Sequence, residues 1–182
     1  GFALFPPYHH RTERPWMWPY SVPILEEKVV VFCRGDRMES PRPVWPRDYY
    51  GLSIAMNSGF MVGGNAFVDA LQQGHIKLEE SSSNATNIIK LVRRRVDCYI
   101  NDRLSILWEL KRLKESGAIS KVQVESLVEG ATISKEKGYL GYTDRDEGRF
   151  AFKSDFVAAF DAVIAEMNAS GELQDIVDQF LK

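Results

Sequence analysis

The pattern of apolar and polar positions changes near residue 50. All eight prolines lie between Pro6 and Pro46, and proline lacks a backbone donor and disfavours helix in the residue before it. The first fifty residues are therefore predicted to be extended or looped, with short strands at Phe2–Phe5 and Lys28–Cys33. The second strand, KVVVFC, is nearly all apolar and rich in β-branched residues, which is typical of a strand buried on both faces.

After Pro46 the sequence predicts alternating strands and helices. In chain order these are a strand at Gly51–Met56, a helix at about Gly64–Gln73, a strand at Ile76–Glu80, a helix at Asn84–Arg95, a strand at Val96–Asn101 and a helix at about Arg103–Ser116. Weaker patterns at Lys121–Leu127 and Tyr139–Thr143 predict further strands, and two apolar stripes predict helices around residues 156–167 and 173–181. Such alternation predicts an α/β fold, with mostly parallel sheets flanked by helices.

Composition excludes several classes of protein. The 182 residues carry 23 basic and 25 acidic side chains, a formal charge of -2, and 45% of them are hydrophobic. This charge balance excludes an electrostatic nucleic-acid binder, and the apolar content excludes a disordered chain. No apolar run approaches the ~18 residues that a membrane helix needs. The basic run Arg93–Arg95 favours a solvated helix end, because cations there complement the helix dipole.

A glycine-rich turn at Asn57–Gly64, NSGFMVGG, lies between a predicted strand and a predicted helix. Such a turn exposes backbone N–H groups at the positive end of the helix dipole, which suits an anion. It lacks the Lys-Ser/Thr of a phosphate-binding loop and does not match the dinucleotide fingerprint. An ordinary tight turn is an equal alternative.

Two charged residues are candidates for binding a ligand. Asp102 follows a predicted strand and precedes a predicted helix, so it can cap that helix, face a ligand ammonium at the carboxyl end of the strand, or do both. Arg14 lies among aromatic residues, and its guanidinium can hold a carboxylate through two hydrogen bonds. An ordinary surface arginine is the alternative.

Motifs for catalysis and metal binding are absent from the sequence. Histidines occur only at His9, His10 and His75, with no zinc-ligand spacing of cysteine and histidine. We expect no catalytic residue, no metal and no cofactor. Cys33 and Cys98 fall in predicted strands and can pair in an oxidising compartment, but their spacing does not decide whether they do.

Several segments in order resemble one family. Arg11-Thr12-Glu13-Arg14 is followed by Tyr20-Ser21-Val22-Pro23, then Gly51–Met56, Ser58-Gly59, the run Arg95–Asp102 and the ending Gly171–Ile176. Together they resemble the bacterial extracellular solute-binding proteins of family 3, the amino-acid-binding type with the two-lobed periplasmic-binding-protein type 2 fold.

The resemblance spans the whole chain but only about two thirds of the family, and it implies that the start of lobe 1 is missing. It assigns residues 1–28 and 138–182 to the remainder of lobe 1, and residues 29–137 to lobe 2. A lobe without its first strands exposes sheet edges and apolar surface, so such a chain is expected to dimerise or to exchange segments.

The resemblance also implies a ligand site. Arg14 would hold the α-carboxylate of an amino acid, Asp102 its ammonium, and the turn would donate backbone N–H groups. The residues assigned to the ligand are Arg14, Asp102, His9, Asn57, Ser58, Gly59, Phe60, Met61 and Asn101. Phe60 stands where the family commonly has a ligand-binding threonine, so the preference for the ligand's side chain is expected to differ.

The function implied is periplasmic capture of an amino acid or similar small polar solute by hinge closure, for delivery to a membrane permease of the ABC type. Two alternatives remain open on the same fold. One is a dehydratase-type enzyme, for which only His9, His10 and Asp102 are candidate acids or bases. The other is the sensory ligand-binding module of a receptor.

Overall fold

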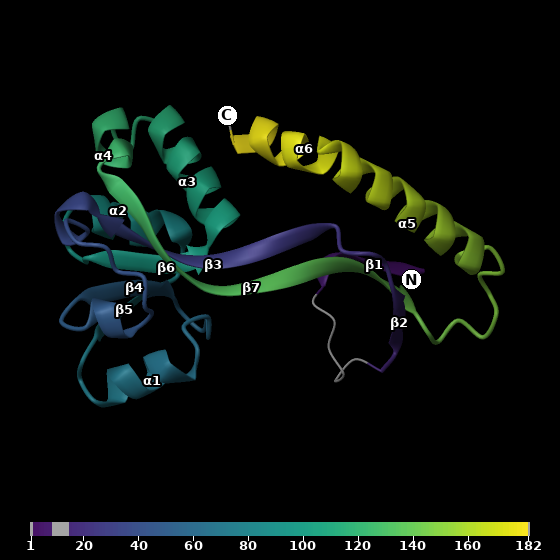
Figure 1. Ribbon diagram of the computed structural model, residues 1–182, viewed down its shortest axis with the longest axis horizontal. Coiled ribbons are helices and arrows are strands. Elements are labelled where there is room, and N and C mark those ends of the chain that lie inside the picture. Colours follow the sequence, from purple (N-terminus) through teal and green to yellow (C-terminus); the bar gives the residue numbers. More distant parts are fainter. Residues whose placement is uncertain (1, 9–14, 182) are drawn as a thin grey trace. The chain divides into compact units, whose positions relative to one another are not determined.

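The computed structural model describes residues 2–8 and 15–181, which divide into two compact units. Unit 1 consists of residues 1–27 and 136–180, and unit 2 of residues 28–135. The chain passes between the units twice, within strands β3 (Leu25–Arg34) and β7 (Leu127–Thr143). Each unit therefore contains part of both strands (Figure 1).

Unit 2 is built on a sheet in the order β3-β6-β4-β5. Strand β4 pairs in parallel with β5 and β6, whereas β3 is antiparallel to β6. The sheet is therefore mixed rather than mostly parallel. Helices connect β4, β5 and β6, as parallel pairing requires, but no α-helix separates β3 from β4. The bounds are β4 (Ser53–Asn57), α1 (Asn65–Gln72), β5 (Lys77–Ser81), α2 (Asn84–Val92), β6 (Cys98–Asp102) and α3 (Arg103–Glu115), with short 3-10 helices at Gly35–Arg37 and Arg47–Tyr49.

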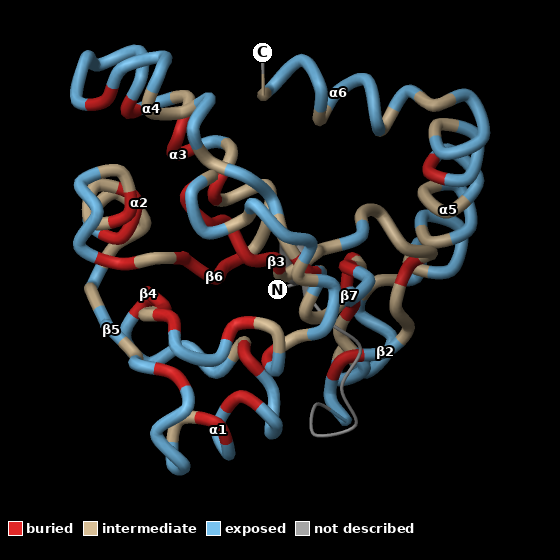
Figure 2. Tube along the Cα trace, turned by 60° about the vertical axis from the view of Figure 1, so that its left-hand side comes forward, coloured by how far each residue is buried: buried red, intermediate tan, exposed pale blue. Residues whose placement is uncertain are grey.

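The core of unit 2 lies on both faces of this sheet. Because side chains alternate along a strand, Val31 and Cys33 of β3 pack on the face that α1 covers, and Val30 and Phe32 pack on the opposite face with α2 and α3. Figure 2 shows buried residues along β3, β4 and β6. The prediction that Lys28–Cys33 is a strand buried on both faces is confirmed.

Cys33 and Cys98 form a disulfide, which answers a question that the sequence left open. They face each other in the register of β3 and β6, and both side chains are fully buried. The disulfide links residues 65 apart in the sequence, so it joins the first strand of unit 2 to the strand that carries Asp102.

The weak strand predicted at Lys121–Leu127 is wrong. Residues Lys121–Glu125 form helix α4, and β7 begins only at Leu127. Ser120 and Gln123 make a capping box, in which each side chain accepts a hydrogen bond from the backbone N–H of the other residue. This reciprocal cap favours a helical turn, whereas the alternation of Val122 and Val124 favours a strand.

Unit 1 contains β1 (Ala3–Tyr8) and β2 (Met17–Tyr20), both antiparallel to β7, followed by α5 (Lys153–Ser170) and α6 (Glu172–Leu181). The two predicted C-terminal helices are thus confirmed. Rings pack around Phe2, from Tyr142, Phe150, Phe152 and Phe156. In the described part of the chain, no helix has the length and apolar character needed to cross a membrane.

Candidate functional site

Strands β4 and β6 bring two predicted ligand-binding segments to one end of the sheet in unit 2. Ala55 and Tyr99 are paired in register, and Asn57 and Asn101 each lie two residues further along these parallel strands. The glycine-rich turn begins after β4, while Asp102 ends β6. This is the end of the sheet formed by the carboxyl ends of the parallel strands, where open α/β folds bind ligands.

The turn uses some of its backbone donors internally. The N–H of Ser58 donates to the carbonyl of Ser81 at 2.9 Å, and that of Phe60 to the carbonyl of Asn57 at 3.1 Å. Within the described residues, the N–H groups of Gly59 and Met61 have no hydrogen-bond partner. The side chains of Phe60 and Met61 are 45% and 91% exposed. The turn thus offers two backbone donors flanked by apolar side chains.

Asp102 caps helix α3, and only one of its carboxylate oxygens is used for the cap. Oδ1 accepts a hydrogen bond from the N–H of Ser105 at 2.8 Å. Oδ2 is buried and has no hydrogen-bond partner among the described residues. A buried carboxylate oxygen without a hydrogen-bond partner destabilises the fold. A cationic ligand group that donates to this oxygen would remove that penalty. The prediction that Asp102 caps a helix is confirmed. Its binding of a ligand ammonium stays a prediction, for which Oδ2 is the available oxygen.

Five polar side chains form a network beneath these two segments, and four of them are buried whereas Asn84 is half-buried. Oδ1 of Asn84 accepts from Nδ2 of Asn57 at 2.6 Å and from Nδ2 of Asn101 at 2.9 Å, and the Tyr99 hydroxyl lies 3.0 Å from it. Nδ2 of Asn101 also donates to the Tyr99 hydroxyl at 2.8 Å. Nδ2 of Asn87 donates to Oδ1 of Asn57 at 2.8 Å.

Sequence analysis missed three members of this network, Asn84, Asn87 and Tyr99. A signal was available: Tyr99 is a hydroxyl-bearing residue inside a buried strand, and Asn84 and Asn87 lie three residues apart on α2. Burial raises the pKa of Tyr99 to about 12, although hydrogen bonding to Asn101 lowers it. The hydroxyl is therefore neutral at physiological pH and can both donate and accept.

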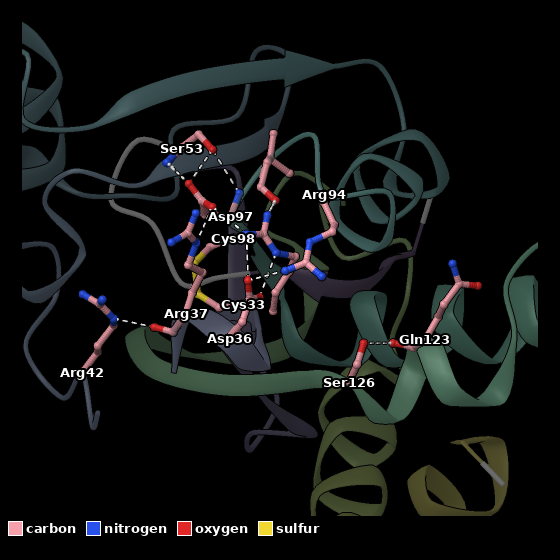
Figure 3. Close-up of polar contacts among 12 residues, drawn as sticks. Cys33, Asp36, Arg37, Arg42, Ser53, Arg94, Asp97, Cys98, Gln123 and Ser126 are labelled. Atoms are coloured by element: carbon pink, nitrogen blue, oxygen red, sulfur yellow. Dashed lines mark hydrogen bonds and ion pairs between the residues drawn. A yellow bond between two sulfur atoms is a disulfide. The ribbon is translucent and has the colours of Figure 1, made fainter. Parts of the chain in front are cut away.

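At the opposite end of β6, an ion-pair network surrounds Asp97 (Figure 3). Its Oδ1 lies 3.1 Å from Nη2 of Arg34 and accepts from Nε of Arg37 at 2.9 Å, while its Oδ2 accepts from both the N–H and the hydroxyl of Ser53. Arg34 is 8% exposed. Asp97 thus ties β6 to β4 and to the loop after β3.

The basic run Arg93–Arg95 contributes to the same network. Nη2 of Arg94 donates to Oδ2 of Asp36 at 2.6 Å, and Asp36 also accepts from Nε of Arg34 at 3.0 Å. Arg94 therefore pairs with a carboxylate of its own chain. The interpretation of this run as the end of a helix agrees with α2, which ends at Val92.

Acid is expected to weaken this network. Burial alone would raise the pKa of Asp97, but hydrogen bonds from Ser53 and from Arg37 lower it overall, and a hydrogen bond from Arg34 lowers the pKa of Asp36. A carboxyl group whose pKa is lowered by folding adds stability above its unfolded pKa, near 3.8 here, and that stability is lost as the pH falls further. Urea unfolding at pH 7, 5 and 3 should therefore show a similar midpoint at pH 7 and 5 and a lower one at pH 3.

Two predicted ligand residues, Arg14 and His9, lie outside the described residues. Asn57, Asn101 and Asp102 are joined through the network and the backbone, whereas Ser58 to Met61 form the adjoining turn. Among the residues that the structure describes, no group of three or more His, Cys, Asp or Glu side chains is placed to hold a metal ion.

Comparison with solved structures identifies the fold. Substrate binding domain 2 of Lactococcus lactis GlnP has a TM-score of 0.71 and 11% identity, covering 98% of this chain and 68% of that one. A variant of ArgBP from T. maritima has a TM-score of 0.57 and 17% identity, with the same coverage. This chain has the two-lobed periplasmic-binding-protein fold. The alignments cover 68% of the length of each of these two chains.

A third similar structure is the ligand-binding core of GluR0 in complex with L-glutamate. Its TM-score is 0.61 at 12% identity, and the alignment covers 97% of this chain and 70% of that one. No model of a known protein family matches the chain, and no curated protein sequence matches it. The predicted two-lobed α/β fold is thus confirmed, with a mixed sheet in place of a mostly parallel one.

Proposed function

We propose that the protein captures an amino acid or a similar small polar solute outside the cytoplasm and presents it to an ABC-type permease. In this proposal unit 1 corresponds to lobe 1 and unit 2 to lobe 2. The observation that carries the proposal is the buried, unpaired Oδ2 of Asp102 beside the exposed turn, at the ligand-binding edge of this fold. Proteins of this fold that bind amino acids or arginine support the assignment.

The chemistry of the ligand follows from the groups that would contact it. Asp102 supplies negative charge for an ammonium, the N–H groups of Gly59 and Met61 supply donors for an anionic or carbonyl oxygen, and Arg14 would bind the carboxylate. A micromolar dissociation constant corresponds to about 8 kcal/mol. Hydrogen bonds to charged groups contribute about 1.5–3 kcal/mol each, so these contacts and desolvation together can supply it.

Ligand binding would favour a closed state by flexing the two strands that pass between the units. These crossings lie at residues 27–28 of β3 and 135–136 of β7. A ligand shifts such an equilibrium only by its difference in affinity for the two states. A zwitterionic amino acid can have such a difference in affinity, because its positive group and its negative group each need a partner of opposite charge.

Titration calorimetry against a panel of amino acids and similar small polar solutes tests the proposal. At least one should bind, and Asp102→Asn should weaken its binding about tenfold or more, because the charge is lost. Asparagine also caps helices well, so the melting temperature should stay nearly unchanged. Arg14→Ala should weaken the same ligand about tenfold, whereas Glu79→Ala, at an exposed carboxylate of unit 2, should have no effect. If no member of this panel binds, the proposed function is wrong.

The sensory module of a receptor is a second candidate, favoured by the similarity to the GluR0 ligand-binding core. It would use the same site, so calorimetry does not separate it from transport. Co-purification with a permease favours transport, whereas fusion to a signalling domain in the complete protein favours sensing.

A dehydratase-type enzyme would need turnover of small carboxylates, which a direct assay detects.

A further inference from the structure

The polar network centred on Asn84 connects the two segments at the carboxyl ends of β4 and β6. Asn84 receives hydrogen bonds from Asn57, where the turn begins, and from Asn101, the residue before Asp102. Asn84 itself comes from a third element, the first turn of α2. One side-chain oxygen therefore joins the two segments to which we assign ligand contacts in unit 2.

The path from Asn84 to each segment is continuous. On one side, the backbone carbonyl of Asn57 accepts from the N–H of Phe60 and so closes the turn. On the other side, Oδ1 of Asn101 accepts from the N–H of Asp102 at 2.9 Å. The amide orientations are consistent, because every nitrogen in these contacts donates and every carbonyl oxygen accepts.

The Tyr99 hydroxyl reinforces the same junction. It lies 3.0 Å from Oδ1 of Asn84 and 3.1 Å from Oδ1 of Asn57, and it accepts from Nδ2 of Asn101. Tyr99 is fully buried and Asn101 is 4% exposed. Buried hydrogen bonds of this kind are costly to break, because each group left unpaired loses its hydration without compensation.

We propose that Asn84, supported by Tyr99, is a positioning residue that holds the Asn57–Met61 turn and Asp102 in one fixed arrangement. The consequence for affinity rests on the proposed function, whereas the coupling of the two segments does not. Asn84 acts through Asn57 and Asn101. Removing its side-chain amide is expected to loosen both segments at once, although they are more than forty residues apart in the sequence.

Hydrogen exchange of the ligand-free protein tests the coupling directly. The N–H of Phe60 reports on the turn, and the N–H of Asp102 reports on the site carboxylate. In Asn84→Ala both should exchange about tenfold faster, as expected for the loss of partly buried hydrogen bonds. Asn84→Asp keeps an acceptor oxygen in the same place, so both rates should stay close to those of the natural protein.

The matched control is Ser83→Ala, one residue earlier. The Ser83 hydroxyl caps α2 by accepting from the N–H of Thr86 at 3.2 Å. Its loss should speed exchange at Thr86 and leave Phe60 and Asp102 unchanged. If Asn84→Ala affects only one of these two reporter groups, or neither, the proposal is overturned whether or not a ligand is found.

Affinity supplies the second measurement. For the solute that binds best in the amino-acid panel, Asn84→Ala should weaken binding about tenfold, and Ser83→Ala should not. Faster exchange at both reporters with unchanged affinity would overturn the positioning role. Faster exchange at both, with no solute bound by the natural protein, would support the coupling and reject the proposed function. Should Asn84→Ala fail to fold, Tyr99→Phe tests the same junction with a smaller change.

Discussion

Removal of the Cys33–Cys98 disulfide is expected to lower the free energy of unfolding of unit 2 by about 4 kcal/mol. The disulfide closes a loop of 65 residues, and in the chain-entropy treatment a loop of this size restricts the unfolded chain by about that amount. The double variant Cys33→Ala with Cys98→Ala should therefore unfold at a much lower urea concentration, as measured by circular dichroism.

The reduced natural protein is the control for lost packing. Both cysteines are fully buried, so reduction requires partial unfolding, and the protein should be reduced in denaturant and refolded with reductant present. It keeps both sulfur atoms in the core and should lose nearly as much stability as the double variant. A loss below about 1 kcal/mol in both samples would contradict the assignment of a stabilising disulfide.

Asp97→Asn is expected to cost about 3 kcal/mol, because it leaves Arg34 buried without one of its two carboxylate partners. The side chains of Arg34 and Asp97 are 10% and 14% exposed, so little water replaces the lost contact. Arg37 loses its partner as well, and the link from β6 to the loop after β3 is broken. Urea unfolding at pH 7 measures the loss.

Glu129→Gln is the matched control for this prediction, because it removes the carboxylate from an ion pair with an exposed arginine. The side chains of Arg103 and Glu129 are 39% and 35% exposed, and exposed pairs contribute at most about 1 kcal/mol. The difference between Asp97→Asn and the natural protein should also shrink at pH 3, because this pH lies below 3.8, the pKa of the Asp97 carboxyl in the unfolded chain, which then binds a proton. Equal losses for Asp97→Asn and Glu129→Gln at pH 7 would show that burial does not set the strength of these ion pairs.

Residue patterns predicted only part of the candidate site. Spacing placed Asp102 at the end of a strand and before a helix, and the structure confirms the cap. The same spacing could not show that one carboxylate oxygen is used by the helix and the other is left buried and unpaired. Nor could it show that the N–H of Phe60 is used within the turn, because that bond depends on how the backbone folds after Asn57.

Local patterns by themselves determined most of the elements of this protein. The apolar run at Lys28–Cys33 reflects burial on both faces of the sheet. The stripes in α5 and α6 encode helical periodicity, although only Ile164 of α5 and no residue of α6 is buried. At Lys121–Leu127 two local signals conflicted, and the capping box prevailed over the alternation of valines. The parallel pairing of β4, β5 and β6 followed from the helices that connect them.

Only the tertiary structure decided the contacts between segments distant in the sequence. The pairing of Cys33 with Cys98, the antiparallel place of β3, and the junction of Asn57, Asn84, Tyr99 and Asn101 all depend on strand register. Register is set by the packing of the whole sheet against α1, α2 and α3, so no single segment contains it. A buried asparagine therefore looks in sequence like any surface asparagine until its partners are brought beside it.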